Sequence, residues 1–337
     1  MVREIALDLG TTKVSLVSRG GEFLLSVPSV VATEARTGEL IAFGQEAATM
    51  VGRAPDGFTV TNPIRNGVIV DFEAAELLVR AFLRCAGVRR IHLPTVVACV
   101  PSATTPVERR AVLEAIYRAG ASDVRLLGHG LAGALGAGAA LDQPSGAVVV
   151  DVGGGVVEVA VLSLGGVVSL RSARFGGVDF DTAIVDHMRA RRDAVVSHDT
   201  AEQIKKDLAV ADLRPGANGQ LATNARTIAV RRVGSGEVAE HCVTSEDVGD
   251  AIYVLIDRIV DLVIDCISEA PPEIATDLID SGIYLVGGGS QLSGFGSLIA
   301  QRTKLPVSVV EDPALATVRG AQHCLGFVDE LADLFLA

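Results

Sequence analysis

A strand, an aspartate, a glycine turn and a second strand follow one another twice in this chain, and this repeat constrains the fold more than any other feature. The first copy occupies residues 4–17 and contains Asp8, and the second occupies residues 147–162 and contains Asp151. Alternating β-branched runs on both sides of a glycine turn are typical of a β-hairpin. Because the second copy begins near the middle of the 337 residues, we expect a duplicated fold with two similar halves.

A second pair of segments repeats in the same order. Residues 95–102 and 283–290 each read as a strand that is followed by a helix, a short strand and another helix. In the first copy, Thr105 and Glu108 form a capping box around Pro106, and Gly120 ends the helix. We therefore predict two α/β halves with small inserts: residues 1–145 with an insert at about 34–62, and residues 146–337 with an insert at about 177–264.

Composition excludes several classes of protein. A net charge of −12 without a basic block argues against a nucleic-acid partner, because phosphate neutralisation needs clustered Lys and Arg. The five cysteines include no CxxC pair, so we expect reduced, mostly buried thiols. The acid Glu4 interrupts any signal-peptide core, and the apolar stretch 131–141 is shorter than the roughly 20 residues of a membrane span. We expect a cytoplasmic protein.

Glycine is abundant, at 36 of 337 residues, against a usual share of about 7%. Glycine turns expose backbone N–H groups that bind anions, and Thr11, Thr12 and Lys13 add hydroxyl donors and a positive charge beside the first turn. Phosphate is the ligand that this chemistry favours. Asp8 and Asp151 would approach the same phosphates, which predicts Mg²⁺ held between them through its waters.

Two further segments fit a nucleotide. Gly287, Gly288 and Gly289 follow a strand and open a helix, where a ligand can lie against the backbone. Thr200 begins a second capping box, which places Glu202 and Lys205 on one helical face. That pair is either a surface ion pair or an edge contact to a nucleoside.

These motifs resemble the actin, heat-shock chaperone and sugar-kinase superfamily, and within it the bacterial actin-like cell-shape proteins of the MreB/Mbl family. The stretches that carry the closer resemblance cover nearly the whole chain: 66–72, 107–110, 136–138, 158–163, 175–177, 200–205 and 311–313. The resemblance implies a duplicated actin-like, ribonuclease-H-like α/β fold whose two domains face a nucleotide cleft.

The resemblance also implies a function. Such a protein binds ATP or ADP with Mg²⁺, polymerises into filaments under the cytoplasmic membrane, and organises membrane-spanning proteins of cell-wall synthesis. The residues expected to hold phosphate are Gly10, Thr11, Thr12, Lys13, Gly153, Gly154 and Gly155. Gly177 is expected at the ribose, and Glu202, Lys205 and Gly287 to Gly289 are expected to flank the adenosine.

The chain departs from the family where water is activated. The family's glutamate pair and the proline after it are replaced by Gly128, His129 and Gly130, and two threonines after the second glycine loop are Val156 and Val157. Because phosphoryl transfer depends on positioning and electrostatics, we expect nucleotide binding with weak or absent hydrolysis. His129 either substitutes as a base or fills space.

Membrane contact is expected at residues 88–94, where Ile91 and Leu93 lie beside two arginines. An ordinary helix-to-strand connection is the alternative. The apolar residues of 327–335 have helical spacing and are expected to dock on the body of the protein.

Three other functions share this fold. A small-molecule kinase or phosphatase would need an acidic side chain directed at a substrate hydroxyl, and the positions expected to supply it hold no acidic residue. A heat-shock chaperone would need a peptide-binding domain after residue 337. A cell-division anchor shares the start at Asp8 to Lys13, but the insert after residue 33 favours the cell-shape group.

Overall fold

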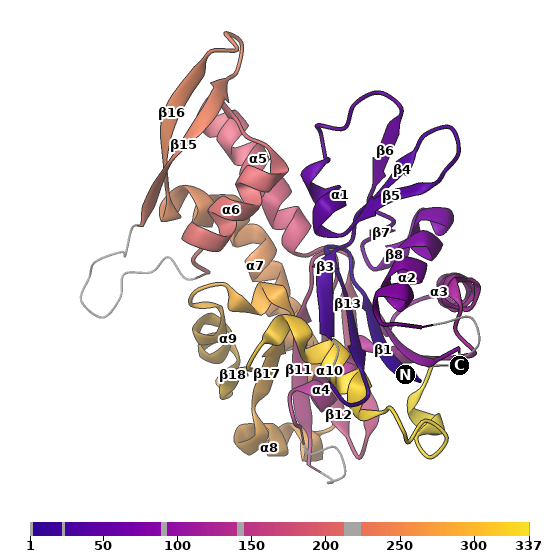
Figure 1. Cartoon of the computed structure of the whole chain (residues 1–337). Coiled ribbons are helices and arrows are strands. Elements are labelled where there is room, and N and C mark those ends of the chain that lie inside the picture. Colours follow the sequence, from indigo (N-terminus) through magenta and orange to yellow (C-terminus); the bar gives the residue numbers. More distant parts are fainter. Residues whose placement is uncertain (1–2, 22–23, 89–92, 140–144, 212–223, 337) are drawn as a thin grey trace.

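Two five-stranded sheets with the same strand order form the centre of the molecule (Figure 1). The computed structural model describes residues 3–21, 24–88, 93–139, 145–211 and 224–336. In each sheet a three-stranded antiparallel meander is extended on one side by two parallel strands. The repeated hairpins and the α/β duplication predicted from sequence are confirmed.

The first sheet has the order β10-β9-β1-β2-β3. Its strands are β1 (Glu4–Leu9), β2 (Lys13–Ser18), β3 (Leu24–Pro28), β9 (Thr95–Val100) and β10 (Asp123–Gly128). Alternate side chains of β1, among them Ile5 and Leu7, face a core formed with helices α2 (Phe72–Cys85) and α3 (Pro106–Ala119). Helix α3 begins at the predicted capping box of Thr105 and ends at Gly120, which has a left-handed backbone conformation.

The second sheet has the order β13-β12-β11-β17-β18. Its strands are β11 (Ala147–Val152), β12 (Val157–Ser163), β13 (Gly166–Ala173), β17 (Ile283–Val286) and β18 (Val307–Val309). Helices α5 (Gly177–Arg191), α7 (Ser245–Ser268), α8 (Pro272–Ser281) and α9 (Phe295–Thr303) supply the core on its outer face. The apolar stripe of α7, which runs from Val248 to Cys266, is buried there.

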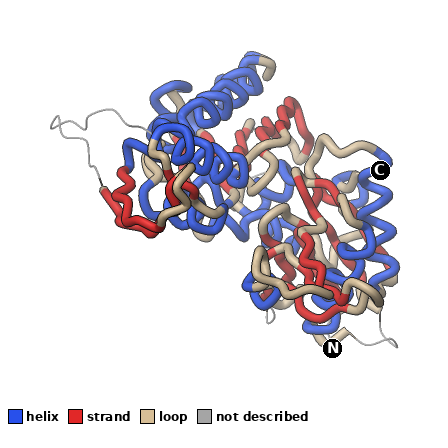
Figure 2. The backbone as a smooth tube through the Cα atoms, turned by 90° about the horizontal axis from the view of Figure 1, so that it is seen from above, coloured by secondary structure: helices blue, strands red, loops and turns tan. Residues whose placement is uncertain are grey.

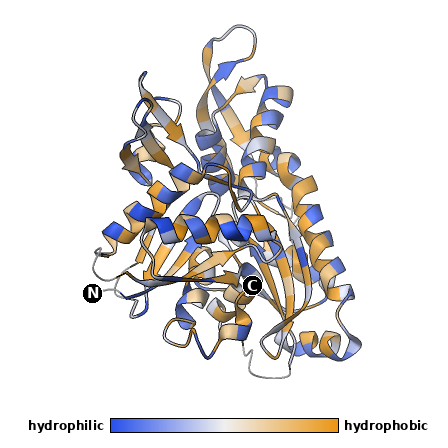
Figure 3. Ribbon diagram, turned by 90° about the vertical axis from the view of Figure 1, so that its right-hand side faces the viewer, coloured by the Kyte–Doolittle hydropathy of each residue, from blue (hydrophilic) through white to orange (hydrophobic). Residues whose placement is uncertain are grey.

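Two short helices are exchanged between the halves and join them. Helix α4 (His129–Gly136) follows the first sheet but packs on β11 and β12, whereas α10 (Ala316–His323) follows the second sheet and packs on β1, β2 and β9. They cross so closely that a Cβ atom on Gly136 would lie 1.9 Å from the Ala316 carbonyl oxygen. The inner faces of both sheets share one core with these helices, seen as the orange interior in Figure 3.

Each half carries a small subdomain, and both project toward the top of Figure 1. The first contains β4 (Val31–Glu34), β5 (Leu40–Phe43), α1 (Gln45–Thr49) and β6 (Phe58–Thr61), and the short strands β7 (Ile64–Arg65) and β8 (Val68–Ile69) follow it. The second contains β14 (Ala194–Val195), α6 (His198–Leu208), β15 (Ala225–Arg232) and β16 (Val238–Thr244). The division at residue 145 and the limits of the inserts stay predictions.

Single-turn 3₁₀ helices complete the chain: η1 (Gly288–Gln291), η2 (Pro313–Leu315) and η3 (Ala332–Leu334). The end of the chain docks on the body as predicted, because Leu334 and Phe335 pack against the shared core and the Leu336 N–H donates to the Leu126 carbonyl. Seen from above, both chain ends lie on the lobe of the first half (Figure 2).

One local prediction was wrong, and another was confirmed only for most of its residues. Ser197, not Thr200, is the N-cap of α6, because the Ser197 hydroxyl accepts the Thr200 N–H three residues on. Of the five free cysteines, Cys99, Cys266 and Cys324 are buried as expected, but Cys85 and Cys242 are exposed.

Candidate functional site

The turn between β1 and β2 is built tightly enough to require glycine. A Cβ atom on Gly10 would lie 2.5 Å from the Lys13 carbonyl oxygen. The Thr11 hydroxyl accepts the Gly67 N–H at 3.0 Å, which fixes the turn against the loop between β7 and β8. Thr12 and Lys13 are exposed beside it.

The matching turn between β11 and β12 lies directly against the first. The Gly153 N–H closes it by donating to the Val156 carbonyl at 2.9 Å. A Cβ atom on Gly154 would lie 2.4 Å from Cγ2 of Thr12, and one on Gly155 would lie 2.7 Å from Oγ1 of Thr11. The fold therefore brings together two loops that are almost half a chain apart in the sequence.

The third glycine loop joins the same region. Gly287 has a φ of 79°, and a Cβ atom there would lie 2.3 Å from Oδ1 of Asp151. Gly289 packs on Val152, whereas a Cβ atom on Gly288 would meet open space. The Gly177 N–H donates to the Gly153 carbonyl at 3.0 Å, which brings the start of α5 to the second turn.

Lys205, on α6, contacts the residues beside the second glycine turn, whereas Glu202 forms an ion pair away from that turn. The Lys205 ammonium donates to the Gly177 carbonyl and pairs with Asp181, at 2.7 Å in each case. Burial raises the pKa of Asp181 although Lys205 opposes the rise. Glu202 pairs with Lys206 at 2.7 Å on the partly exposed side of the helix. Asp181 was missed, because no local pattern links it to a lysine on the next helix.

His129, the first residue of α4, lies between the two repeated aspartates. Its Nε2 atom is 3.5 Å from Oδ1 of Asp8, and its Nδ1 atom is 3.6 Å from Oδ2 of Asp151. Burial acts to lower the pKa of His129, but the nearby Asp8 carboxylate outweighs burial, aided by the carboxylates of Asp151 and Glu158, and the pKa is raised to about 9. Burial also raises the pKa of Asp151, to about 7, although His129 opposes the rise.

This arrangement does not fit the hydrated Mg²⁺ predicted between Asp8 and Asp151. The imidazole ring, rather than open space, separates the two carboxylates. Across the described ranges, moreover, no group of three or more His, Cys, Asp or Glu side chains could hold a metal ion.

A buried carboxylate on β12 ties the two halves together beside His129. Glu158 is 1% exposed and accepts hydrogen bonds from the Ser102 N–H at 2.8 Å, from the Ser102 hydroxyl, and from the Gly130 N–H at 2.7 Å. Ser102 follows β9, so the contact crosses from the second half to the first. The sequence placed Glu158 in the second hairpin and in a stretch that carries the family resemblance, and it indicated no role for the side chain.

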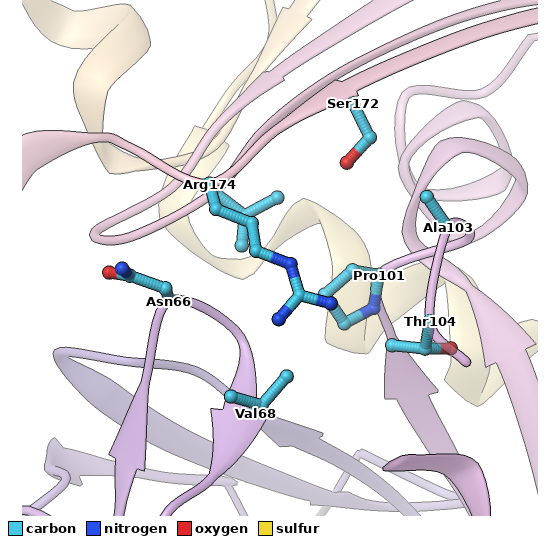
Figure 4. Close-up of a pocket in the computed structure, with 8 residues that line it drawn as sticks. Asn66, Val68, Pro101, Ala103, Thr104, Ser172 and Arg174 are labelled. Carbon is cyan, nitrogen blue, oxygen red and sulfur yellow. The ribbon is translucent and has the colours of Figure 1, made fainter. Parts of the chain in front are cut away.

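The positions expected to activate water hold no hydrogen-bonding side chain apart from His129. Gly128 is buried, Val157 is fully buried on β12, and Val156 is 7% exposed. Val156 lines a small pocket between the halves, together with Asn66, Val68, Pro101, Ala103, Thr104, Ser172 and Arg174 (Figure 4). Arg174 pairs with Glu108 at 2.8 Å.

Of the residues expected to touch a membrane, Leu93 is 45% exposed, and Ile91 lies outside the described residues. Within the described part of the chain, no helix has the length and apolar character needed to cross a membrane.

Comparison with solved structures defines the class of protein. MreB5 of Spiroplasma citri bound to ADP superimposes with a TM-score of 0.89 at 28% identity and 99% coverage of both chains. The MamK double helical filament superimposes with a TM-score of 0.79 over 95% of this chain and 98% of that chain, where 18% identity shows the fold alone. The fold is therefore actin-like.

Sequence comparison narrows the class to a family. The MreB/Mbl protein family model matches residues 2–333. The chain is 34% identical over 330 residues to the cell shape-determining protein Mbl of Bacillus cereus, covering 98% of this chain and 97% of that protein. It is 35% identical over 341 residues to the cell shape-determining protein MreB of Escherichia coli, with 98% and 96% covered. The chain belongs to the MreB/Mbl family.

Proposed function

We propose that this chain binds ATP or ADP between its two halves. The observation that carries the proposal is the direct contact of the two glycine turns, in which Gly154 and Gly155 meet Thr12 and Thr11. Backbone N–H groups of both turns would then surround one phosphate chain, with the exposed Lys13 supplying positive charge. MreB5 of Spiroplasma citri has been solved with ADP and with AMPPNP, which supports the same ligand class here.

The phosphate position between the two turns determines where the other site residues would contact the nucleotide. Gly177 would lie at the ribose, since its N–H already contacts the second turn. Gly288 faces open space, so the third loop has room for adenosine. Lys205 would flank the adenosine from α6 while it stays paired with Asp181, and Glu202 would lie one turn earlier on that helix.

Hydrolysis by this site would be weak or absent. The predicted water-holding positions are the buried Val156 and Val157, and the Glu158 carboxylate beside them is occupied by donors from Ser102 and Gly130. His129 faces two carboxylates rather than a free water position. Removing a group that orients the attacking water costs orders of magnitude in rate while leaving binding possible.

Filament formation under the cytoplasmic membrane completes the proposal. The relatives are named cell shape-determining proteins, and a filament of this chain would scaffold membrane-spanning proteins of wall synthesis. The exposed Leu93 supports contact with the membrane surface. The Mg²⁺ expected with the nucleotide stays a prediction, against which the position of His129 argues.

Electron microscopy of the purified chain with ATP, with ADP and without nucleotide tests the proposal, beside a direct nucleotide titration. We expect saturable binding of about one nucleotide per chain, and filaments. Filaments without any binding would reduce the function to a pure scaffold. The absence of filaments in all three conditions would contradict the cytoskeletal function.

A further inference from the structure

The segment 128–130 holds the His129 ring in place by close packing on β12 and on the loop after β9. A Cβ atom on Gly128 would lie 2.6 Å from Oγ of Ser102, and one on Gly130 would lie 2.7 Å from Cβ of Ala160. Both glycines are therefore needed for the first turn of α4 to approach so closely. Glu158 then fixes that turn by accepting the Gly130 N–H at 2.7 Å.

The charges around the ring explain why an imidazole is suited to this place. Asp8 faces it from β1 and Asp151 from β11, with only 15% and 8% of their side chains exposed. Two carboxylates that share a poorly solvated site repel each other unless a positive charge or a hydrogen-bond donor lies between them. The two ring nitrogens each face one of these carboxylates.

We infer that His129 takes the place of a divalent cation between Asp8 and Asp151, so that nucleotide binding by this chain does not depend on Mg²⁺ or Mn²⁺. The ring fills the space in either protonation state. The inference rests on the proposed nucleotide site, and it specifies the ligand as a nucleoside di- or triphosphate free of metal. The backbone donors of the two turns and Lys13 would then face its charge alone.

Calorimetric titration of ADP into the protein tests the dependence on metal. With the wild type we expect dissociation constants in EDTA and in excess Mg²⁺ that agree within about threefold (about 0.6 kcal/mol). With His129→Ala we expect binding at least tenfold tighter in Mg²⁺ than in EDTA. His323→Ala, at the exposed end of α10, serves as the matched control and should behave as the wild type. A wild type that binds at least tenfold tighter in Mg²⁺ would overturn the inference.

Electron paramagnetic resonance of Mn²⁺ with protein alone separates this inference from the proposed function. We expect no Mn²⁺ bound to the wild type and one Mn²⁺ bound to His129→Ala, with a dissociation constant of about 10⁻⁴ to 10⁻³ M. Asp151→Asn in the His129→Ala background should abolish it. Mn²⁺ bound by the wild type, or by neither protein, would overturn the inference even if no nucleotide binds. His129→Asn replaces His129→Ala if circular dichroism shows that the latter is unfolded.

Discussion

Glu158→Ala is the substitution whose effect can be worked out most fully from the structure. It would leave the part-buried N–H group of Ser102 and the buried N–H group of Gly130 without their acceptor. Each unsatisfied donor costs about 1–3 kcal/mol, so the free energy of unfolding should fall by about 2–6 kcal/mol. An unfolding entropy of about 2.1 cal/mol/K per residue, over 337 residues, converts this into a Tm lower by about 3–9 °C.

Differential scanning calorimetry of the nucleotide-free protein measures this shift. Ser102→Ala is the graded control, because it removes the hydroxyl donor but leaves both backbone N–H groups bound to the carboxylate; it should cost about 0.5–1.5 kcal/mol. The reasoning would be refuted if Glu158→Ala lowered Tm no more than Ser102→Ala does. Such a result would mean that water satisfies the freed donors and that Glu158 does not hold the halves together.

Three further predictions concern separate parts of the chain. Gly287→Ala should weaken ADP binding at least tenfold in a calorimetric titration, because its φ is 79° and the new Cβ atom would lie 2.3 Å from a carboxylate oxygen on β11; unchanged affinity would contradict the site. Burial acts to raise the pKa of Asp247, but hydrogen bonds from the helix cap and from Arg192 outweigh burial and lower the pKa from 3.8. The stabilisation by Asp247 is therefore present above about pH 4 and lost as the pH falls below that value. Urea denaturation should show the wild type more stable than Asp247→Asn at pH 7 by about 1 kcal/mol and no more stable at pH 2. Leu93→Glu should reduce sedimentation with anionic vesicles at least fivefold, whereas Leu164→Glu, at a more exposed turn residue, should not. Equal effects would remove Leu93 from the membrane contact.

Local patterns predicted the parts of the fold that depend on neighbouring residues. Both hairpins and the helix capped at Thr105 form where the sequence indicated. Each is determined by turn chemistry or by apolar periodicity, which are visible within about 20 residues. The cap of α6 was placed at Thr200 instead of Ser197 because both residues begin plausible capping patterns.

Contacts between residues that are distant in the sequence could not be predicted from local patterns. The exchange of α4 and α10 between the halves depends on the crossing at Gly136, which no local pattern reveals. The sequence predicted that Asp8 and Asp151 approach one another, but the position of His129 between them depends on how both sheets pack on α4. Asp181 was missed for the same reason, since its partner Lys205 lies on another helix.

The central claim is that this actin-like chain retains its nucleotide and has lost the means to hydrolyse it. The measurement that tests it most directly is chromatographic identification of the nucleotide that remains on the protein after incubation with ATP and rapid removal of the free ligand. The account predicts intact ATP at about one per chain after hours at room temperature. Recovery of ADP would contradict the loss of hydrolysis, and recovery of no nucleotide would contradict the binding site itself.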